Sequence, residues 1–183
     1  MQERFTQYNL TIEGQLEPTF ARDFLSALDW CAKNPRCEGN LGLPRSKMPQ
    51  FGFGVVEDFM KWLDHEKGVA SKLTVMSATD LRATQREINA KKVQRYADRP
   101  GPISMDPIPV SREGYILDGH HRWAATLTRS LRRRVKVYKI DLPIRPLLKA
   151  AHEFPGTFQV DLMDAPVDPT RVRLGAYHYD RRR

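Results

Sequence analysis

Five consecutive residues in the second half of the chain combine a carboxylate, a glycine, two imidazoles and a guanidinium: Asp118-Gly119-His120-His121-Arg122. They follow the apolar run 115–117 and precede the alanine-rich run 123–125. This order predicts a strand, a tight turn and the start of a helix. A helix N-terminus exposes unpaired N–H groups with partial positive charge, and glycine lets the backbone approach a ligand closely. The segment therefore predicts a binding site for an anion such as phosphate.

The side chains of this segment suggest chemistry beyond anion binding. Arg122 can bind two phosphate oxygens at once. His120 and His121 titrate near neutral pH, so they can donate to phosphate or transfer protons. Asp118 is a candidate to hold Mg²⁺ or to orient an attacking hydroxyl. A structural alternative stands beside this interpretation, because Asp-Gly is a common turn and Asp a common helix cap.

A second polar segment, Thr84-Gln85-Arg86-Glu87, lies upstream. Thr84 and Glu87 have the spacing of a capping box, which predicts a helix through about residue 97. If this helix start faces the first segment, Thr84 and Gln85 can add hydrogen bonds to the ligand. Glu87 is then a candidate proton acceptor, and its role as a mere helix-capping carboxylate is an equally good interpretation.

Apolar periodicity predicts an α+β fold, a small mixed sheet with flanking helices. Pro109 places the run 108–110 at the edge or start of a strand, in a hairpin with the run 115–117. Aromatic residues at helical spacing in 54–66 predict core packing, with Gly68 ending that helix. We expect helices at about 17–31, 54–66, 84–97, 121–128 and 143–152, and strands at 73–76, 108–110, 115–117 and 135–141.

Composition limits the classes of protein that the chain can represent. It has 183 residues with 40% hydrophobic residues, enough for one domain with a core. We find no apolar stretch of about 20 residues for a membrane span and no apolar leader, and we expect no membrane partner. The only cysteines, Cys31 and Cys37, cannot make a disulfide framework, which favours a reducing, cytoplasmic location.

A net charge of +8 favours polyanionic partners, although it also serves solubility. Much of it follows the first segment closely, at Arg132, Arg133, Arg134 and Lys136. On a strand, Arg134 and Lys136 share one face and Val135 and Val137 the other. These four basic residues are candidate nucleic-acid contacts, and a solvated strand face is the alternative.

The run D-G-H-H-R-W-A-A, with L-R-A-T-Q-R-E-I-N-A-K-K-V about 30 residues upstream, resembles the ParB/sulfiredoxin-like superfamily, often labelled the ParB-like nuclease domain. The resemblance covers about residues 72–152. It implies a ParB/sulfiredoxin-like domain at 71–155, an N-terminal helical extension at 1–70 and a partly irregular extension at 156–183. Members of the superfamily include CTP-binding DNA-partition proteins, ATP-using sulfiredoxins, ADP-using free-serine kinases and presumed nucleases. Many relatives are encoded by phages, which would place this chain in a host cytoplasm.

Individual positions separate these members. The reactive cysteine of sulfiredoxins corresponds to His120, which argues against sulfiredoxin chemistry. The Gly-Glu-Arg-Arg of partition proteins corresponds to residues 119–122, where the glutamate is missing. Free-serine kinases are most similar, because they have an Asp-Gly-His loop around the nucleotide phosphates and an upstream catalytic glutamate, whose counterpart here is Glu87.

The resemblance and the side chains together predict phosphoryl transfer or nucleotide hydrolysis with ATP, ADP or CTP and Mg²⁺. Asp118, Glu87, His120 and His121 would be the catalytic residues. Thr84, Gln85, Gly119, both histidines and Arg122 would bind the phosphates, and a small hydroxyl-bearing molecule would accept the phosphoryl group. Two alternatives remain open: a nuclease that acts through the same groups, and a nucleotide- or DNA-binding module without turnover.

Overall fold

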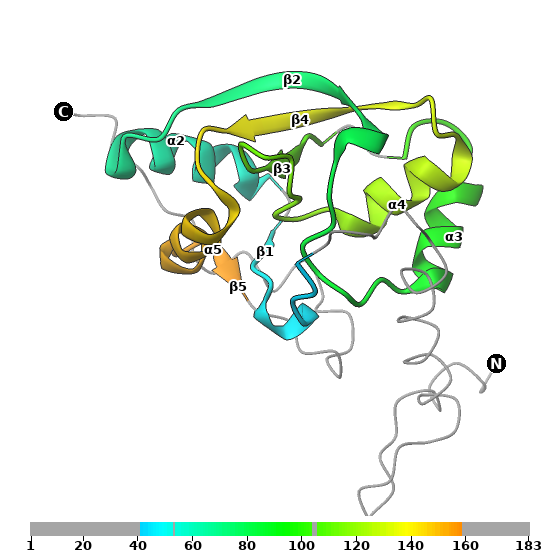
Figure 1. Ribbon diagram of the computed structural model, residues 1–183, viewed down its shortest axis with the longest axis horizontal. Helices are drawn as coiled ribbons and strands as arrows, with labels where there is room; N and C mark the ends of the chain where they lie inside the picture. The colour runs from blue at the N-terminus through cyan, green and yellow to red at the C-terminus, as the bar shows by residue number, and fades with distance from the viewer. Residues whose placement is uncertain (1–40, 53, 104–105, 159–183) are drawn as a thin grey trace, which may run out of the picture.

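A mixed three-stranded sheet runs along the top of the computed structural model in the view of Figure 1, and the structure describes residues 41–52, 54–103 and 106–158. Its order is β2-β4-β3, with β2 antiparallel and β3 parallel to the central strand β4. A separate two-stranded ribbon pairs β1 with β5. The strands are β1 (Gln50–Phe51), β2 (Ser71–Ser77), β3 (Ile108–Val110), β4 (Arg134–Ile140) and β5 (Thr157–Phe158). The α+β class with a small mixed sheet is confirmed.

Four α-helices flank this sheet in two pairs (Figure 1). One pair lies toward the start of β4 and the other toward its end. The first pair is α3 (Ala90–Asp98) and α4 (His120–Arg129), and the second is α2 (Val55–Lys67) and α5 (Ile144–Glu153). None of the helices in the described residues has the length and apolarity needed to cross a membrane.

The two helix pairs enclose two hydrophobic cores, and β4 contributes to both. Val135 and Val137 on one face of β4 pack with α3 and α4, whereas Tyr138 and Ile140 on the other pack with α2 and α5. This follows from the alternation of side chains along a strand. Because the second core joins α2 to residues beyond 71, the boundary that we expect at residue 70 does not coincide with a break in packing.

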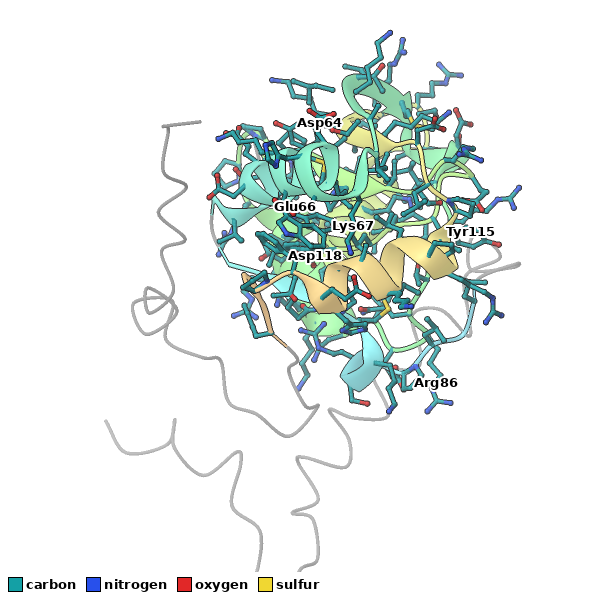
Figure 2. The ribbon with its side chains drawn as sticks, turned by 90° about the vertical axis from the view of Figure 1, so that its left-hand side faces the viewer. Asp64, Glu66, Lys67, Arg86, Tyr115 and Asp118 are labelled. Carbon is teal, nitrogen blue, oxygen red and sulfur yellow. The ribbon has the colours of Figure 1, made fainter. Side chains whose placement is uncertain are left out.

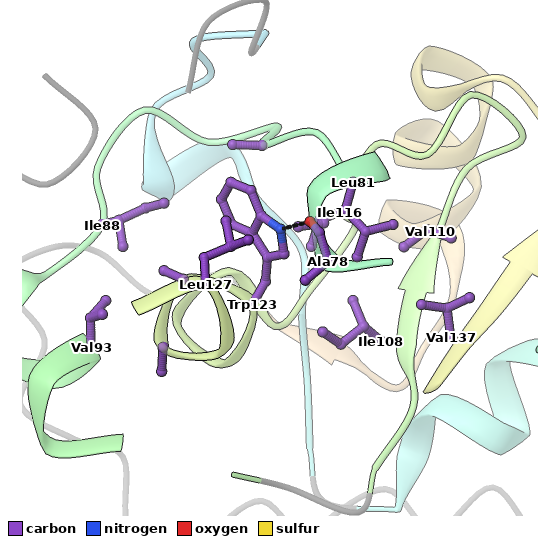
Figure 3. Close-up of a cluster of buried hydrophobic side chains, with 13 residues drawn as sticks. Ala78, Leu81, Ile88, Val93, Ile108, Val110, Ile116, Trp123, Leu127 and Val137 are labelled. Atoms are coloured by element: carbon purple, nitrogen blue, oxygen red, sulfur yellow. Dashed lines mark hydrogen bonds between the residues drawn. The ribbon is translucent and has the colours of Figure 1, made fainter. Parts of the chain in front are cut away.

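Trp123 lies in the first turn of α4, and its side chain packs in the first core (Figure 3). The indole is fully buried, and its Nε1–H donates to the carbonyl of Ala78 at 2.7 Å. That bond satisfies the one polar atom of a large buried aromatic side chain. It fixes the first turn of α4, and therefore residues 118–122, against the segment that follows β2.

Most of the expected elements are present in the described residues. The helices at 54–66, 121–128 and 143–152 and the strands at 73–76 and 135–141 are confirmed within a few residues. Gly68 ends α2 with a positive φ of 62°, and the α2 aromatics Phe59 and Trp62 pack in the second core. The expected helix at 17–31 lies outside the described residues.

The expected hairpin is confirmed in part. Ser111 N donates to Tyr115 O and Leu117 N to Pro109 O, which folds the second run back on the first. Only 108–110 becomes a strand, at the sheet edge where its proline is tolerated. The run 115–117 makes single bridges instead, to Arg82 and Val110.

The predicted start of a helix at Thr84 is wrong. The helix α3 begins at Ala90, with the Asn89 side chain accepting from Lys92 N at 2.9 Å as the N-cap. Thr84 and Glu87 therefore form no capping box. Residues 84–89 run as an irregular segment, because their backbone N–H groups bond the two histidines of α4 instead of forming a helical turn.

Candidate functional site

The imidazole of His120 joins the start of α4 to the segment 84–89. His120 is 3% exposed, and its Nε2 accepts from Thr84 N at 3.0 Å and from Gln85 N at 3.3 Å. Burial first, and the positive charge of Arg45 second, lower the pKa of His120 to about 3. The ring is thus neutral near pH 7, with its proton on Nδ1, because Nε2 acts as an acceptor.

His121 makes an equivalent connection one residue further on. Its Nε2 accepts from Asn89 N at 3.2 Å. Burial, followed by the charges of Lys92 and Arg45, lowers the pKa of His121 well below its ordinary value. The sequence predicts phosphate donors or proton carriers at His120 and His121. The structure instead uses Nε2 of both rings to hold the backbone of 84–89.

Glu87 lies inside the molecule, next to residues 41–45. Residues 41–45 run beside 83–87: Leu43 N donates to Thr84 O, and Arg86 N to Leu43 O. The carboxylate of Glu87, 2% exposed, then accepts from Arg45 N at 2.8 Å and from Arg86 Nε at 2.6 Å. Figure 2 shows Arg86 beside the short helix η3 (Arg45–Lys47), on the side where these two segments meet.

This pairing brings Arg45 to the start of α4, where it meets Lys92 of α3. Both side chains are half-buried. Burial lowers the pKa of Arg45, while Asp118 and then Glu87 act to raise it. Burial also lowers the pKa of Lys92, repulsion from Arg45 adds to this effect, and Asp118 opposes it. Arg45, Lys92, Glu87 and Asp118 therefore form one electrostatic cluster, which we call the inner cluster.

Asp118 and Gly119 form the turn into α4. Gly119 is the N-cap, with a φ of 97° that favours glycine, and its N–H donates to Asp118 Oδ1 at 2.7 Å. The first helical acceptor is Gly119 O, which takes Trp123 N at 3.0 Å. The N–H groups of residues 120–122 therefore have no acceptor within the helix itself, as at any helix start. Asp118 lies near the half-buried cations Arg45 and Lys92 and acts electrostatically on both.

Arg122 lies on another side of the helix. Its Nη1 donates to Asp106 O at 2.8 Å, and its guanidinium covers Gly119, where an added Cβ would lie 2.9 Å from Nη2. It lines a cavity with Arg133, Arg134 and Lys136, which we call the outer pocket. The Arg122 guanidinium thus fills the space over Gly119, and its predicted role as a phosphate clamp applies to the outer pocket.

Thr84 and Gln85 face the interior. Gln85 is 1% exposed and its side chain donates to Glu87 O at 2.6 Å, which is a structural role. Thr84 is fully buried, and its Oγ1 is the one buried side-chain oxygen or nitrogen without a hydrogen-bond partner among the described residues. Such an orphan next to His120 is unusual, since buried hydroxyls are almost always bonded.

The remaining predicted residues lie at the start of β4. Arg133, Arg134 and Lys136 are exposed and line the outer pocket, and the Arg134 guanidinium donates to Val75 O at 3.1 Å. Arg132 is exposed in the preceding turn and does not line that pocket. Of the predicted site residues, Glu87 and Asp118 belong to the inner cluster, whereas the outer pocket is lined by Arg122, Arg133, Arg134 and Lys136.

Sequence reasoning misses Arg45 and Lys92. Lys92 lies within the upstream run that carries the family resemblance, and its place in the first turn of α3 becomes clear once Asn89 is recognised as the cap. Arg45 has no local signal, because it reaches the cluster only through the pairing of residues 41–45 with 83–87. A proline-flanked connector does not reveal such a partner.

A magnesium site at Asp118 would need few protein ligands. No group of three or more His, Cys, Asp or Glu side chains that could hold a metal occurs in the residues that the structure describes. Mg²⁺ commonly keeps several waters and uses one or two carboxylates together with substrate phosphates. Asp118 fits that requirement as a single carboxylate beside an anion site, whereas both oxygens of Glu87 are already bonded.

Comparison with known proteins gave no match of the chain to any protein-family model, to any curated protein or to any solved structure. The chemistry of the inner cluster and of the outer pocket has therefore to be argued from their residues.

Proposed function

We propose that the inner cluster binds the phosphates of a nucleotide and supports transfer of a phosphoryl group to a hydroxyl or to water. One observation carries the proposal. Two half-buried cations, Arg45 and Lys92, are held close enough to repel each other beside the start of α4. Like charges removed from water repel each other, and a bound anion would relieve that repulsion.

The surroundings favour an anion with several charges. The partial positive charge at the start of α4 adds to the two cations. Asp118 and Glu87 offset part of this charge, so that the cluster is stable without ligand. Glu87 has both oxygens bonded to the Arg45–Arg86 segment, and we assign it a positioning role. The likeness of the Asp-Gly-His loop to that of free-serine kinases supports a nucleotide as the anion.

Asp118 is the group that we assign to proton transfer. Its Oδ1 accepts from Gly119 N, so the other oxygen, Oδ2, is assigned to the attacking hydroxyl or water. The hydroxyl proton would pass to Oδ2, its oxygen would form the new bond to phosphorus, and the bond to the departing nucleotide oxygen would break. Mg²⁺, when bound with the nucleotide, would neutralise charge on the phosphate oxygens.

Binding is tested by calorimetry with ATP, ADP and CTP in the presence of Mg²⁺. We expect Lys92→Gln to weaken the preferred nucleotide about tenfold or more, as loss of one charge-assisted contact would. Lys91→Gln is the matched control, because it removes the same charge from the neighbouring exposed residue of α3. Equal affinities of the Lys92→Gln variant and the unaltered chain would contradict the proposal.

Turnover is tested separately, with Asp118→Asn. We expect this variant to keep nucleotide affinity within a few-fold and to lose nucleotide conversion. A second candidate is a nucleotide-binding module without turnover, which the full engagement of Glu87 and both Nε2 atoms favours. Binding by the unaltered chain with no conversion, whatever hydroxyl compound is added, would select that second function. Nicking of a plasmid with Mg²⁺ or Mn²⁺, lost in Asp118→Asn, would select a nuclease instead.

A further inference from the structure

The outer pocket is a second concentration of positive charge with its own geometry. Arg122 of α4 meets Arg133, Arg134 and Lys136 of the segment that enters β4 around a cavity of about 180 Å³. Among the described residues of its lining, Asp106 is the only acidic one. The sequence predicts the basic run on β4 as a nucleic-acid contact, but it does not bring Arg122 to that run.

Two of the guanidinium groups are held in place by backbone carbonyls. Arg122 Nη1 donates to Asp106 O at 2.8 Å, and Arg134 Nη2 donates to Val75 O at 3.1 Å. A guanidinium carries five N–H donors in a fixed planar arrangement. Groups that are already oriented lose less conformational entropy when they bind an anion. The bonds to Asp106 and Val75 therefore favour binding at this place over diffuse attraction.

The walls and the size of the cavity restrict the ligand. Ile103, Ile108 and Val135 contribute apolar lining, which lowers the local dielectric and strengthens charge interactions. The volume is below the roughly 300 Å³ at which sites for whole small ligands begin. It suits one phosphate group, with the rest of the ligand outside. Arg134 and Lys136 continue along the strand at the side of the pocket, about 7 Å apart.

We propose that the outer pocket seats one backbone phosphate of a nucleic acid, with adjoining phosphates contacting the basic residues along β4. Guanidinium groups bind phosphodiester oxygens in a bidentate manner, and the row of cations that enters β4 suits the regularly spaced charges of a phosphate backbone. The part of the lining that the structure describes contains no aromatic side chain on which bases could stack. Binding should therefore be insensitive to sequence and strongly dependent on salt.

The test is fluorescence anisotropy with the full chain and a labelled DNA duplex, without nucleotide, over a series of salt concentrations. We expect Arg133→Gln with Lys136→Gln to weaken binding about tenfold or more and to reduce the steepness of the salt dependence by about two counterions. Both side chains are exposed, so the variant should fold. Residues 181–183, which are all arginine, are the same in the variant and in the unaltered chain, so their contribution to DNA affinity cancels in the comparison.

The matched control is Arg145→Gln with Lys149→Gln, which removes the same net charge from exposed residues of α5 that do not line the pocket. We expect it to bind within about threefold of the unaltered chain. An equal loss in both variants would reduce the effect to net charge and overturn the proposal. Competition by polyglutamate as effective as competition by unlabelled duplex would also overturn it, in favour of an acidic peptide.

A third variant, Arg122→Gln, tests the pocket itself. Arg122 lies outside the basic run, and we expect its replacement to weaken duplex binding about fivefold. If this variant binds the duplex as tightly as the unaltered chain, the contact is restricted to the strand, and the proposal that a phosphate binds in the outer pocket is wrong. Because the inner cluster is not involved, this result does not depend on the proposed nucleotide chemistry.

Discussion

The segment 118–122 contributes Asp118 to the inner cluster and Arg122 to the outer pocket. The surroundings of these two sites differ in burial, hydrogen bonding and exposure of charge. His120 and His121 turn inward, where their acceptor nitrogens are occupied by backbone N–H groups. Arg122, the next residue, turns to the solvent side and joins the cations of β4. Each residue advances about 100° around a helix, so consecutive side chains cannot all face one ligand. One motif therefore serves two surfaces of the molecule.

The difference also separates stability from charge. Around His120, polar groups are buried and mutually bonded, so that losing one leaves others unsatisfied. Around the outer pocket, cations are exposed and few of their bonds are buried, so a substitution there changes the electrostatic potential more than the fold. Substitutions near His120 should thus change mainly the stability of the fold, whereas substitutions in the outer pocket should change mainly the binding of anions.

Removal of the His120 imidazole should have the largest effect. His120→Ala leaves the N–H groups of Thr84 and Gln85 without an acceptor and opens a cavity, which together should lower the free energy of unfolding by about 4 kcal/mol. Arg122→Ala should lower it by about 1 kcal/mol or less, because that side chain is partly exposed. Urea denaturation measures both values. Similar losses in the two variants would remove the distinction between the two sides.

Acid should destabilise the protein through the same imidazole. In the unfolded chain His120 has an ordinary pKa near 6.5, whereas in the folded chain its pKa is about 3. The unfolded state therefore binds more protons between these values. Stability is fully present above about pH 6.5 and is lost as the pH falls toward 3, by about 2 kcal/mol between pH 7 and pH 5. His121 acts in the same direction.

His120→Gln isolates this effect. The side-chain oxygen of the glutamine can replace Nε2 as an acceptor, and glutamine does not titrate. Denaturation midpoints at pH 7, 6 and 5 should fall less steeply in this variant than in the unaltered chain. Parallel curves would show that His120 is not held neutral in the folded state.

Gly119 connects the two sides, and Gly119→Ala should have an intermediate effect. A φ of 97° is unfavourable for alanine by about 1 to 2 kcal/mol, and the new methyl group would also displace the Arg122 guanidinium. In an Arg122→Ala background the displacement disappears and only the backbone strain remains. A double-mutant cycle by thermal denaturation should therefore show a smaller cost of Gly119→Ala in that background. Equal costs in both backgrounds would mean that Arg122 yields freely.

The sequence predicts the elements that local patterns define. The apolar stripe of 54–66 and the alternation of 135–141 give α2 and β4, and Asp118-Gly119 gives the turn into α4. The predicted start of α3 is wrong, because the spacing of Thr84 and Glu87 is compatible with a helix cap but does not require one. The competing interaction, backbone N–H to His120 and His121, joins residues more than 30 positions apart, as the separation of 36 between Thr84 and His120 illustrates.

The candidate site was predictable in the same uneven way. Asp118, Gly119 and the basic run are recognisable from neighbouring residues. Whether an imidazole beside them donates or accepts depends on burial, and the position of Arg45 depends on the pairing of 41–45 with 83–87. Neither can be read from a local pattern, because both arise when distant segments pack.

The smallest expected effect is also the sharpest test of the inner cluster. Thr84 Oγ1 is buried without a partner in the described residues, so Thr84→Val, which keeps the shape of the side chain, should raise the free energy of unfolding by about 1 kcal/mol. If the hydroxyl serves the nucleotide, the same variant should bind it several-fold more weakly. Denaturation and calorimetry on one sample separate the two quantities. A gain in stability with unchanged nucleotide affinity would exclude Thr84 from the site, and a loss of stability would show that the hydroxyl is bonded in the apo protein.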